Sequence, residues 1–585
     1  MKKLICLDIE VYPNYFLLAI KGLESKKLIT FDTQTKLTPA DKRGIHKVLR
    51  SYVSFGYNSS SYDMPLIQCM LNGDSCSQLY IKSKKLIEER VPHWRIVEMT
   101  EDWDHIDIKE PAPAVMISLK NYGTRMGSKK LWDLPFDPHT PLKDSEIETL
   151  NAYCENDLDT TIDLYNEIKN RLDLRTELSA QYATDLRSKS DAQIAEAVFV
   201  KELRYKGKAP ELAKNYRAIY KPPSCVYFET DDLNELLNDI RDVRFEVGGN
   251  GSVKMPKELS NRKIVIGDTT YKIGIGGLHS QEKKLVVESN KQFVLRNADV
   301  ASYYPSMILE FGFYPKQFGR KFLDVYRKIY DTRLAAKKSG DKTVNEGLKI
   351  VLNGSFGKLG SKYSKLYSPD LMLQVTITGQ LMLLMLIEQL HKRGFRVVSS
   401  NTDGVEYYCE RDNVQLAEAI IADWEIDTGM VMEHGEYKGL YAKDVNNYIA
   451  VYDGYVKAKG LYTKTSLMKG RSTPIVFEAI REYLLNATEI EQTIRACKDI
   501  NEFVSGRTVK GGGEYEGEYL GKVVRWYYST ESLGYLSYVT NGNKVPKTDG
   551  AKPMMDLTDE LPADLDYQWY IDEAKSKLGD LGYVN

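Results

Sequence analysis

The stretch that decides the fold is RNADVASYYPS, residues 296–306, which follows the apolar segment QFVL and places Asp299 where a predicted strand ends. A carboxylate at a strand end is well placed to hold a metal ion, because the sheet fixes the backbone while the turn exposes the side chain. A lone turn Asp more often caps a helix or bonds its own backbone. A second carboxylate, Asp403, favours the metal-ligand interpretation of Asp299, because it lies at the tip of a predicted hairpin, RVVSS-NTDG-VEYYC.

The composition is that of an ordinary globular chain. Its 585 residues are enough for several domains, and 42% are hydrophobic and 28% charged. The formal net charge of -2 means that any surface for nucleic acid must come from local segregation of charge. The seven cysteines form no CxxC pair, which favours a reducing compartment over disulfides or structural zinc. The apolar segment 371–387 predicts a buried helix and not a membrane span.

Hydrophobic periodicity predicts the main elements. Strands are expected over 2–20 and 26–32, and the strong helical pattern over 145–172 opens with Asp144 and Ser145 as candidate caps. Together they predict an α/β domain of about 180 residues. Residues 316–358 are expected to form two helices broken at 339–341. Beyond 466 the pattern mixes helix and turn, with one aromatic strand at 519–530 and a mobile glycine loop at 511–513.

A first constellation of acids lies in the N-terminal third. Asp8 and Glu10 stand at i and i+2 on a predicted strand, so both project from one face, and burying them without a cation would cost several kcal/mol. Carboxylates from separated elements are what a two-metal phosphodiesterase needs. Each acid taken alone is better explained as a cap or a solvated group. The other members follow the next strand or share one face of the 145–172 helix: Asn58, Asp63, Tyr153 and Asp157.

A second constellation joins Asp299 and Asp403 to a basic segment. Phosphoryl transfer needs carboxylates for two magnesium ions and cations for a triphosphate. Residues 316–342 hold nine Lys or Arg against three Asp, which suits a polyanionic ligand, although an exposed charged helix is the commoner meaning of such a run. Pairs at i and i+4 on the two predicted helices are Arg333 with Lys337 and Lys349 with Asn353.

The first constellation resembles the proofreading exonuclease of DNA polymerases. DIE at 8–10, NSSSYD at 58–63 and YCEND at 153–157 match that family's three motifs in order and internal spacing. The resemblance implies that Tyr153 orients the attacking water and that Asn58 contacts DNA. A supporting lysine occurs in some relatives, and Lys130 and Lys143 are both candidates for it. The implied metal ligands are Asp8, Glu10, Asp63 and Asp157.

The second constellation resembles family B DNA polymerases. DVASYYPS, KIVLNGSFG and NTDG look like the three polymerase motifs, YKGLYAKDVNNY like the primer-gripping motif, and GIGGLHS like the glycine pair between the two activities. The resemblance covers nearly the whole chain to about residue 465, and the closing part looks like the thumb of bacteriophage members. It implies magnesium ligation by Asp299 and Asp403, a steric gate at Tyr304, and nucleotide or DNA contacts by Arg333, Lys337, Lys349, Asn353, Gly276, Gly277, Lys438 and Tyr441.

The implied fold is α/β and α+β multidomain, with a ribonuclease H-like exonuclease domain and a right-hand polymerase of palm, fingers and thumb. The expected boundaries are 1–181 for the exonuclease, 182–262 for a helical connecting region, 263–315 for the first part of the palm, 316–358 for the fingers, 359–465 for the second part of the palm and 466–585 for the thumb.

The sequence departs from the family pattern at three positions. Asn401 stands where relatives often carry an Asp, Tyr303 where Leu is usual, and Phe356 where Tyr is usual. The resemblance aligns Asp403 with the acid that ligates metal, so activity is expected to survive. An inactive polymerase is the competing interpretation, and it requires the other intact motifs to be relics.

The function expected from these motifs is template-directed DNA synthesis with 3′→5′ proofreading in phage replication. Two Mg²⁺ ions per site are implied, with Mn²⁺ as a substitute. The implied partners are primer–template DNA, dNTPs and a phage helicase, clamp or single-strand binding protein, in the host cytoplasm and without a membrane. Three alternatives stay open: a nuclease with a DNA-binding scaffold, a primase-polymerase and, ranked last, a non-enzymatic clamp.

Overall fold

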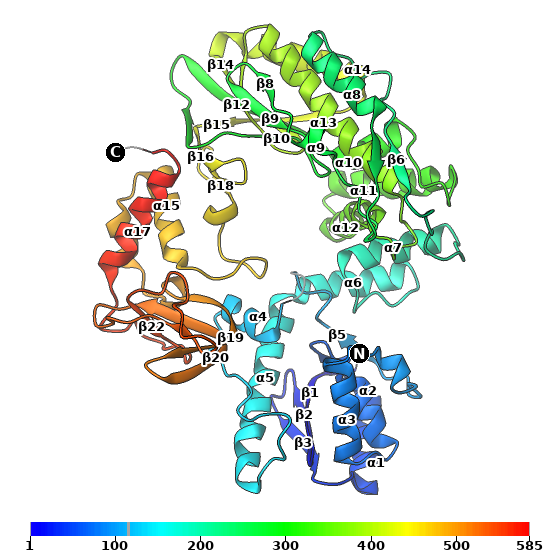
Figure 1. Ribbon diagram of the computed structural model, residues 1–585, viewed down its shortest axis with the longest axis vertical. Coiled ribbons are helices and arrows are strands. Elements are labelled where there is room, and N and C mark those ends of the chain that lie inside the picture. Colours follow the sequence, from blue (N-terminus) through cyan, green and yellow to red (C-terminus); the bar gives the residue numbers. More distant parts are fainter. Residues whose placement is uncertain (1, 114–116, 584–585) are drawn as a thin grey trace. The chain divides into compact units, whose positions relative to one another are not determined.

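The computed structural model describes residues 2–113 and 117–583, and contacts divide the chain into two compact units. Both units mix helices with sheets (Figure 1), so the mixed α/β multidomain architecture expected from the sequence is present. The finer division into exonuclease, palm, fingers and thumb stays a prediction. Unit 1 comprises Met1–Ser190, Thr465–Val476 and Ile494–Tyr570, and unit 2 comprises Asp191–Lys464, Phe477–Thr493 and Ile571–Asn585.

A five-stranded mixed sheet, in the order β3-β2-β1-β4-β5, forms the N-terminal part of unit 1. Strand β1 is antiparallel to β2 and parallel to β4, as an α/β domain requires. The elements are β1 (Leu4–Tyr12), β2 (Tyr15–Gly22), β3 (Leu28–Thr33), α1 (Pro39–Ser51), β4 (Val53–Gly56), α2 (Asp63–Leu71), α3 (Cys76–Ile87), β5 (His105–Asp107), α4 (Leu119–Met126), α5 (Ile147–Glu167) and α6 (Lys169–Gln181), with short 3-10 helices at His93–Arg95 and Asp144–Glu146.

Alternation along β1 decides which way its acids point. Ile5 and Ile9 pack into an apolar cluster with α1, α2 and α3, whereas Cys6 and Tyr12 pack with Leu150 and Leu158 of α5. Because side chains alternate along a strand, the even-numbered acids of β1 are turned toward α5. The expected cap at Asp144 and Ser145 is wrong, because these residues form the short 3-10 helix and α5 begins after Glu146 without a side-chain cap.

A second sheet, in the order β21-β19-β20-β22, completes unit 1 from the C-terminal part of the chain. The mobile loop expected at 511–513 is instead inside β19, where the register shifts after Thr508. Gly511 and Gly512 have φ of 84° and 100°, which only glycine adopts readily, so the run forms an irregular stretch of strand. The elements are β19 (Ser505–Tyr515), β20 (Glu518–Tyr528), β21 (Ser537–Tyr538) and β22 (Ala551–Pro553), with a 3-10 helix at Ile500–Glu502.

Unit 2 is organised around an antiparallel sheet in the order β13-β14-β12-β15. Residues 316–358 form two helices, and Gly340, with φ of 77°, ends the first of them, as expected. The elements are α7 (Asp191–Glu202), β6 (Arg217–Ile219), α8 (Asp231–Asp242), β7 (Arg244–Glu246), α9 (Lys257–Ser260), β8 (Ile264–Ile266), β9 (Thr269–Lys272), β10 (His279–Ser280), β11 (Leu285–Glu288), β12 (Phe293–Val300), α10 (Tyr303–Glu310), α11 (Lys321–Ser339), α12 (Lys342–Leu359), α13 (Pro369–Lys392), β13 (Arg396–Ser400), β14 (Gly404–Glu410), α14 (Val414–Thr428), β15 (Met432–Tyr437), β16 (Gly439–Asp444), β17 (Asn447–Val451) and β18 (Val456–Lys459), with 3-10 helices at Arg411–Asn413 and Gly460–Tyr462. Three further helices cross the unit boundaries: α15 (Pro474–Asn486), α16 (Ile490–Ala496) and α17 (Tyr567–Asp580).

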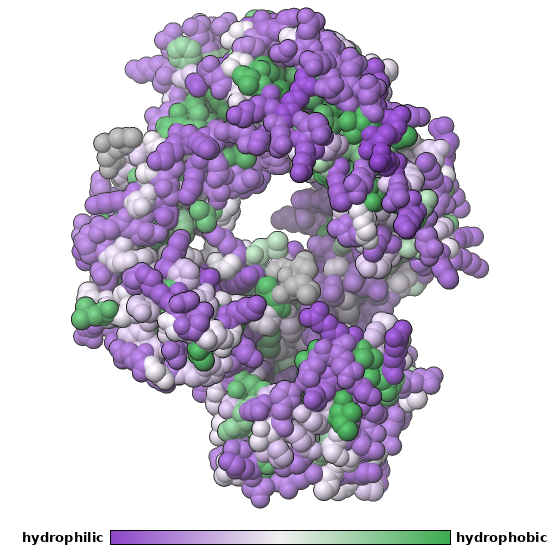
Figure 2. All heavy atoms as spheres, in the orientation of Figure 1, coloured by the Kyte–Doolittle hydropathy of each residue, from purple (hydrophilic) through white to green (hydrophobic). Residues whose placement is uncertain are grey.

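Helix α13 is the one described helix that is long and apolar enough to cross a membrane. Its most apolar window is 83% buried inside the protein, and Trp424 of α14 donates a hydrogen bond to the Met382 carbonyl within it. It therefore lies in the core of unit 2. Hydrophilic residues cover most of the face seen in Figure 2.

Candidate active sites

The acids of β1 form the first candidate site with helix α5. Asp8, Glu10 and Cys154 place one possible ligand atom each within 4.8 Å of one another, and the Cys154 thiol donates to Asp8 Oδ2 at 3.7 Å. Asp63, at the start of α2, accepts a hydrogen bond from the Ile9 amide at 3.2 Å. Carboxylates of β1 and α2 thus lie close to a thiol of α5.

Burial and mutual repulsion govern the charge of this cluster. Burial raises the pKa of Asp8, and Asp63, Glu10 and Asp157 raise it further. Burial, with a further contribution from Asp107, raises the pKa of Asp63 to about 7. Such carboxylates are ionised together only when a cation neutralises them. The donor set is all oxygen apart from one thiol, so it fits hard divalent cations such as Mg²⁺.

A lysine that the motifs did not single out completes the cluster. Lys120 of α4 donates to the Tyr153 hydroxyl at 2.7 Å, and it lowers the pKa values of Glu10 and Asp157, which burial raises. The two lysines proposed from the sequence lie elsewhere. Lys130 stacks on the Trp132 ring at 3.7 Å, and Lys143 forms an exposed ion pair with Glu146.

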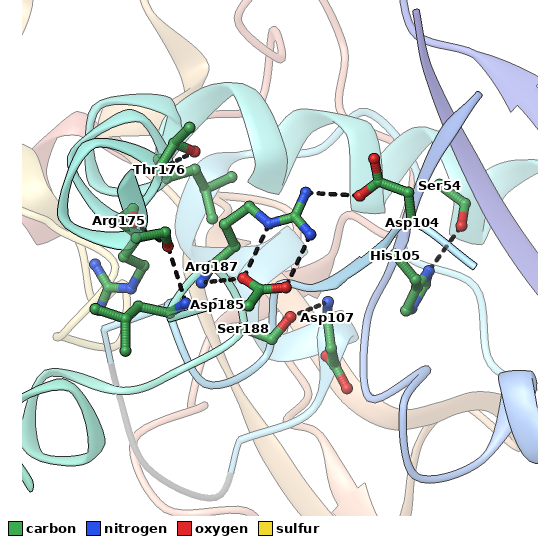
Figure 3. A network of polar contacts seen from close by, with 12 residues as sticks. Ser54, Asp104, His105, Asp107, Arg175, Thr176, Asp185, Arg187 and Ser188 are labelled. Atoms are coloured by element: carbon green, nitrogen blue, oxygen red, sulfur yellow. Dashed lines mark hydrogen bonds and ion pairs between the residues drawn. The ribbon is translucent and has the colours of Figure 1, made fainter. Parts of the chain in front are cut away.

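The edge strand β5 holds the loop that precedes Asp63. The Asp107 carboxylate accepts hydrogen bonds from the amides of Asn58 and Ser60 at 2.9 and 3.0 Å, and Asn58 has a φ of 63°. Lys109 donates to Asn58 Oδ1 at 2.7 Å. The strand itself is tied down by the network in Figure 3, in which Ser188 accepts from the Asp107 amide. The side chains of Asp107 and Lys109 therefore fix the position of Asn58.

Removing one partly buried acid of the cluster should stabilise the protein when no metal is bound. In EDTA, Asp8→Asn is expected to raise the midpoint of thermal unfolding by roughly 4 °C, the shift produced by about 1–2 kcal/mol in a unit of this size. Carboxyls whose pKa is raised in the folded state favour folding fully below their unfolded pKa of about 4 and lose this contribution as the pH rises through their folded pKa, which is about 7 for Asp63. The difference between variant and wild type should therefore be larger at pH 8 than at pH 6. Equal unfolding midpoints for the variant and the wild type at both pH values would contradict this electrostatic account.

The second candidate site lies where β12 meets the hairpin of β13 and β14. Asp299 pairs across the sheet with Gly404, and the Val300 amide donates to the Asp403 carbonyl at 2.7 Å. Burial raises the pKa of Asp403, and the negative charge of Asp299 raises it further. The structure thus brings the two acids together although about a hundred residues separate them in the chain.

Strained backbone flanks both acids. Ser302 and Thr402, neither of them glycine, have φ of 51° and 69°. Such conformations cost about 1–3 kcal/mol each and cluster at functional sites. Asn297 donates a hydrogen bond to Asp299 Oδ2 at 3.2 Å. Burial, followed by the charge of Asp299, raises the pKa of Glu406 to about 8.

The adjacent glycines Gly276 and Gly277 are expected to respond differently to substitution by alanine. A Cβ at Gly277 would lie 2.9 Å from the Thr402 Cα, whereas a Cβ at Gly276 would meet nothing within 4 Å. Gly277→Ala should therefore displace Thr402 and its neighbour Asp403, and under the DNA polymerase function proposed below it should lower the rate of primer extension at saturating DNA by about 100-fold. Gly276→Ala is the matched control and should change that rate less than about threefold. Equal rates for the two variants would show that the contact with Thr402 is unimportant.

Three of the residues proposed to bind nucleotide, Tyr304, Arg333 and Lys337, have contacts near this site. Tyr304 donates to the Gly276 carbonyl at 3.1 Å, and its ring centroid lies 4.4 Å from that of Phe356. Arg333 donates to Ser302 Oγ at 2.9 Å, and Lys337 pairs with Glu433 at 3.3 Å. Two further residues lie exposed on one face of α12: Lys349 and Asn353.

Tyr441 and Lys438 each have a partner other than Asp299 and Asp403, and their contact with a primer stays a prediction. The Tyr441 hydroxyl donates to Glu288 and its ring lies beside Tyr583, while Lys438 pairs with Asp453 at 2.7 Å. Burial raises the pKa of the Tyr448 phenol, and the next largest contributions come from Glu406 and Asp299.

Comparisons with known proteins give limited similarity. No protein-family model matches the chain. Over 95 residues it is 26% identical to DNA polymerase II of Escherichia coli (strain K12), a match covering 16% of this chain and 12% of that protein. The match therefore spans about an eighth of that relative's length. Among solved structures, the family B DNA polymerase from the hyperthermophilic archaeon Pyrobaculum calidifontis aligns with 100% of this chain and 78% of its own, at 14% identity and a TM-score of 0.42.

Proposed function

We propose that the chain is a DNA polymerase of family B with a 3′→5′ proofreading exonuclease, and that it replicates bacteriophage DNA. The observation that carries the proposal is the approach of Asp299 and Asp403 at one end of an antiparallel sheet, beside Tyr304 and Arg333. The short similarity to a DNA polymerase supports the same class. The expected setting is the host cytoplasm, with a helicase, clamp or single-strand binding protein as partners.

The residues of unit 2 would divide the work of synthesis. Divalent cations held by Asp299 and Asp403 would neutralise the triphosphate and make the primer 3′-hydroxyl a better nucleophile. Arg333, Lys337 and Lys349 would bind the triphosphate oxygens and orient the α-phosphate in line with the attacking oxygen. Tyr304, held by its bond to the Gly276 carbonyl, would exclude a ribose 2′-hydroxyl.

Asn401 has a structural role that suits an active enzyme. Its amide donates to the Val445 carbonyl at 2.8 Å and accepts from the Thr402 hydroxyl at 3.0 Å. An ionised Asp at this position could not donate to Val445. The departure from the family motif thus holds the turn that carries Asp403, which favours an active polymerase over an inactive one.

The residues of unit 1 would carry out hydrolysis. Cations held by Asp8, Glu10, Asp63 and Asp157 would activate water and stabilise the leaving oxygen. The Tyr153 hydroxyl, held by Lys120, would orient the attacking water. Asn58 would contact the 3′-terminal strand from its fixed loop.

One experiment tests both activities. A 5′-labelled primer on a longer template is incubated with the protein and Mg²⁺, with and without dNTPs, and EDTA serves as the blank. We expect products longer than the primer with dNTPs and shorter products without them. Digestion in both tubes, together with no extension by the Asp8→Asn variant, would show that the chain is only a nuclease. Extension on a template without primer would indicate a primase-polymerase.

A further inference from the structure

The C-terminal sheet of unit 1 packs directly on the segment that carries Lys120. Thr508 of β19 donates to Asn121 of α4 at 3.0 Å, and a Cβ at Gly506 would overlap the Thr124 methyl group. Helix α4 and strands β19 and β20 lie side by side in Figure 1. Helix α4 therefore packs against strands that lie about 390 residues further along the chain.

A buried arginine fixes the loop that follows α4. Arg525 of β20 is fully buried and donates to the carbonyls of Ser128, Lys129, Met554 and Met555 at 2.7–3.1 Å. Burial lowers the pKa of its guanidinium to about 10. A buried charge of this kind is stable only while its acceptors stay in place, so the loop is held rigidly against the sheet.

Asp133 connects this interface with the acids. Its Oδ2 accepts from the Tyr519 hydroxyl at 2.8 Å and from the Lys522 amide at 3.2 Å, both on β20. Its Oδ1 accepts from Lys120 at 3.3 Å. Burial alone would raise the pKa of Asp133, but the bonds from Tyr519 and Lys120 outweigh it and keep the pKa below its usual value. Asp133 is therefore an ionised acceptor shared by the two elements.

Lys120 needs this second anchor to keep its place. Its ammonium group lies 4.7 Å from the centroid of the Tyr153 ring while donating to the Tyr153 hydroxyl. A lysine side chain has many rotamers, so an acceptor on each side reduces its freedom. Without Asp133, the ammonium group would be free to move toward the carboxylates of Glu10 and Asp157, which attract it.

We propose that Asp133, held by Tyr519 of the C-terminal sheet, is a positioning residue that fixes Lys120 against Tyr153, so that the nuclease site is completed by a strand from the far end of the chain. This inference rests on the proposed nuclease and goes beyond it, because no motif includes Asp133 or Tyr519. It implies that changes in the C-terminal sheet alter digestion without touching DNA or the acids.

The test uses the full-length chain and digestion of a 5′-labelled single-stranded oligonucleotide in Mg²⁺ without dNTPs. Asp133→Asn keeps the shape and removes the charge, and it should lower kcat by about 10–100-fold while KM changes less than about threefold. Tyr519→Phe removes one hydrogen bond and should lower kcat about fivefold. Tyr515→Phe is the matched control, because its hydroxyl contacts Ser532 instead, and it should leave kcat within about twofold.

A double substitution shows whether Asp133 acts through Lys120. In a Lys120→Gln background, Asp133→Asn should lower kcat no further than about twofold. Primer extension by each variant should match the wild type. An unchanged kcat for Asp133→Asn, equal losses in both backgrounds, or a parallel loss of primer extension would each overturn the proposal. Wild-type protein that does not digest single-stranded DNA would instead remove the proposed nuclease, and the role of Asp133 with it.

Discussion

Protein carrying Asp403→Asn should lose primer extension by about 10³-fold or more and digest single-stranded DNA at the wild-type rate. The substitution keeps the shape of the side chain and the backbone bond from Val300 to the 403 carbonyl. It removes one of two interacting negative charges, so the affinity of the site for divalent cations falls. The measurement is the single-turnover rate of adding one dNTP to a labelled primer.

Asp412→Asn provides the matched control for this prediction. Asp412 lies exposed in unit 2, near the end of β14. Its substitution by Asn is the same chemical change at a residue outside the site. It should extend primers at the wild-type rate. Synthesis retained by Asp403→Asn would contradict the assignment of the polymerase site, and loss of both synthesis and digestion would contradict two separate sites.

The reverse separation is expected for the nuclease. Asp8→Asn should lower digestion of single-stranded DNA by about 10³-fold or more, because Asp8 contacts Asp63 and Cys154 at the centre of the cluster. The rate of adding one dNTP should be unchanged, and the amount of extended product should increase because the primer end is no longer removed. The measurement compares digestion without dNTPs and extension with them in parallel tubes.

Asp102→Asn is the control for the nuclease prediction. Asp102 is exposed in unit 1 and lies outside the acid cluster, so its loss should leave both rates unchanged. Digestion that survives Asp8→Asn would place hydrolysis outside this cluster. A decrease in both extension and digestion would mean that Asp8→Asn disturbs the fold. We expect no such disturbance, because the variant should be more stable than the wild type without metal.

Local patterns were sufficient to place the acids. The period of two along β1 predicts that Asp8 and Glu10 share a face, and the structure places them together with Cys154. The apolar strand before Asp299 and the hairpin around Asp403 predict two strand ends, and pairing between β12 and β14 brings them together. Both patterns depend on residues near one another in sequence, which is why they could be interpreted without a structure.

Lys120 could not be found in this way. Its role depends on Asp133 and Tyr153, which reach it only through packing of α4 against α5 and the C-terminal sheet. Lys130 and Lys143 lie in the same part of the sequence, but Lys130 stacks on Trp132 and Lys143 faces solvent. Spacing to a motif therefore could not identify the supporting lysine.

The resemblance assigns Lys438 and Tyr441 to the primer-gripping motif, and this role stays a prediction. The Tyr441 hydroxyl, on β16, donates to Glu288 of β11. Tyr448 lies on the next strand, β17, and burial, followed by Glu406 and Asp299, raises the pKa of its phenol. A motif in the sequence does not reveal such partners on other strands. A similar limit applies to the C-terminal sheet, whose contacts with Ser128 and Lys129 join residues about 400 positions apart.

The most direct measurement locates Mn²⁺ by its anomalous scattering in crystals of the protein with primer–template DNA and a non-hydrolysable dNTP analogue. The account predicts manganese between the carboxylates of Asp299 and Asp403, with the triphosphate bound on the same ions. Manganese bound to only one of these two acids, or a triphosphate bound away from both, would contradict it.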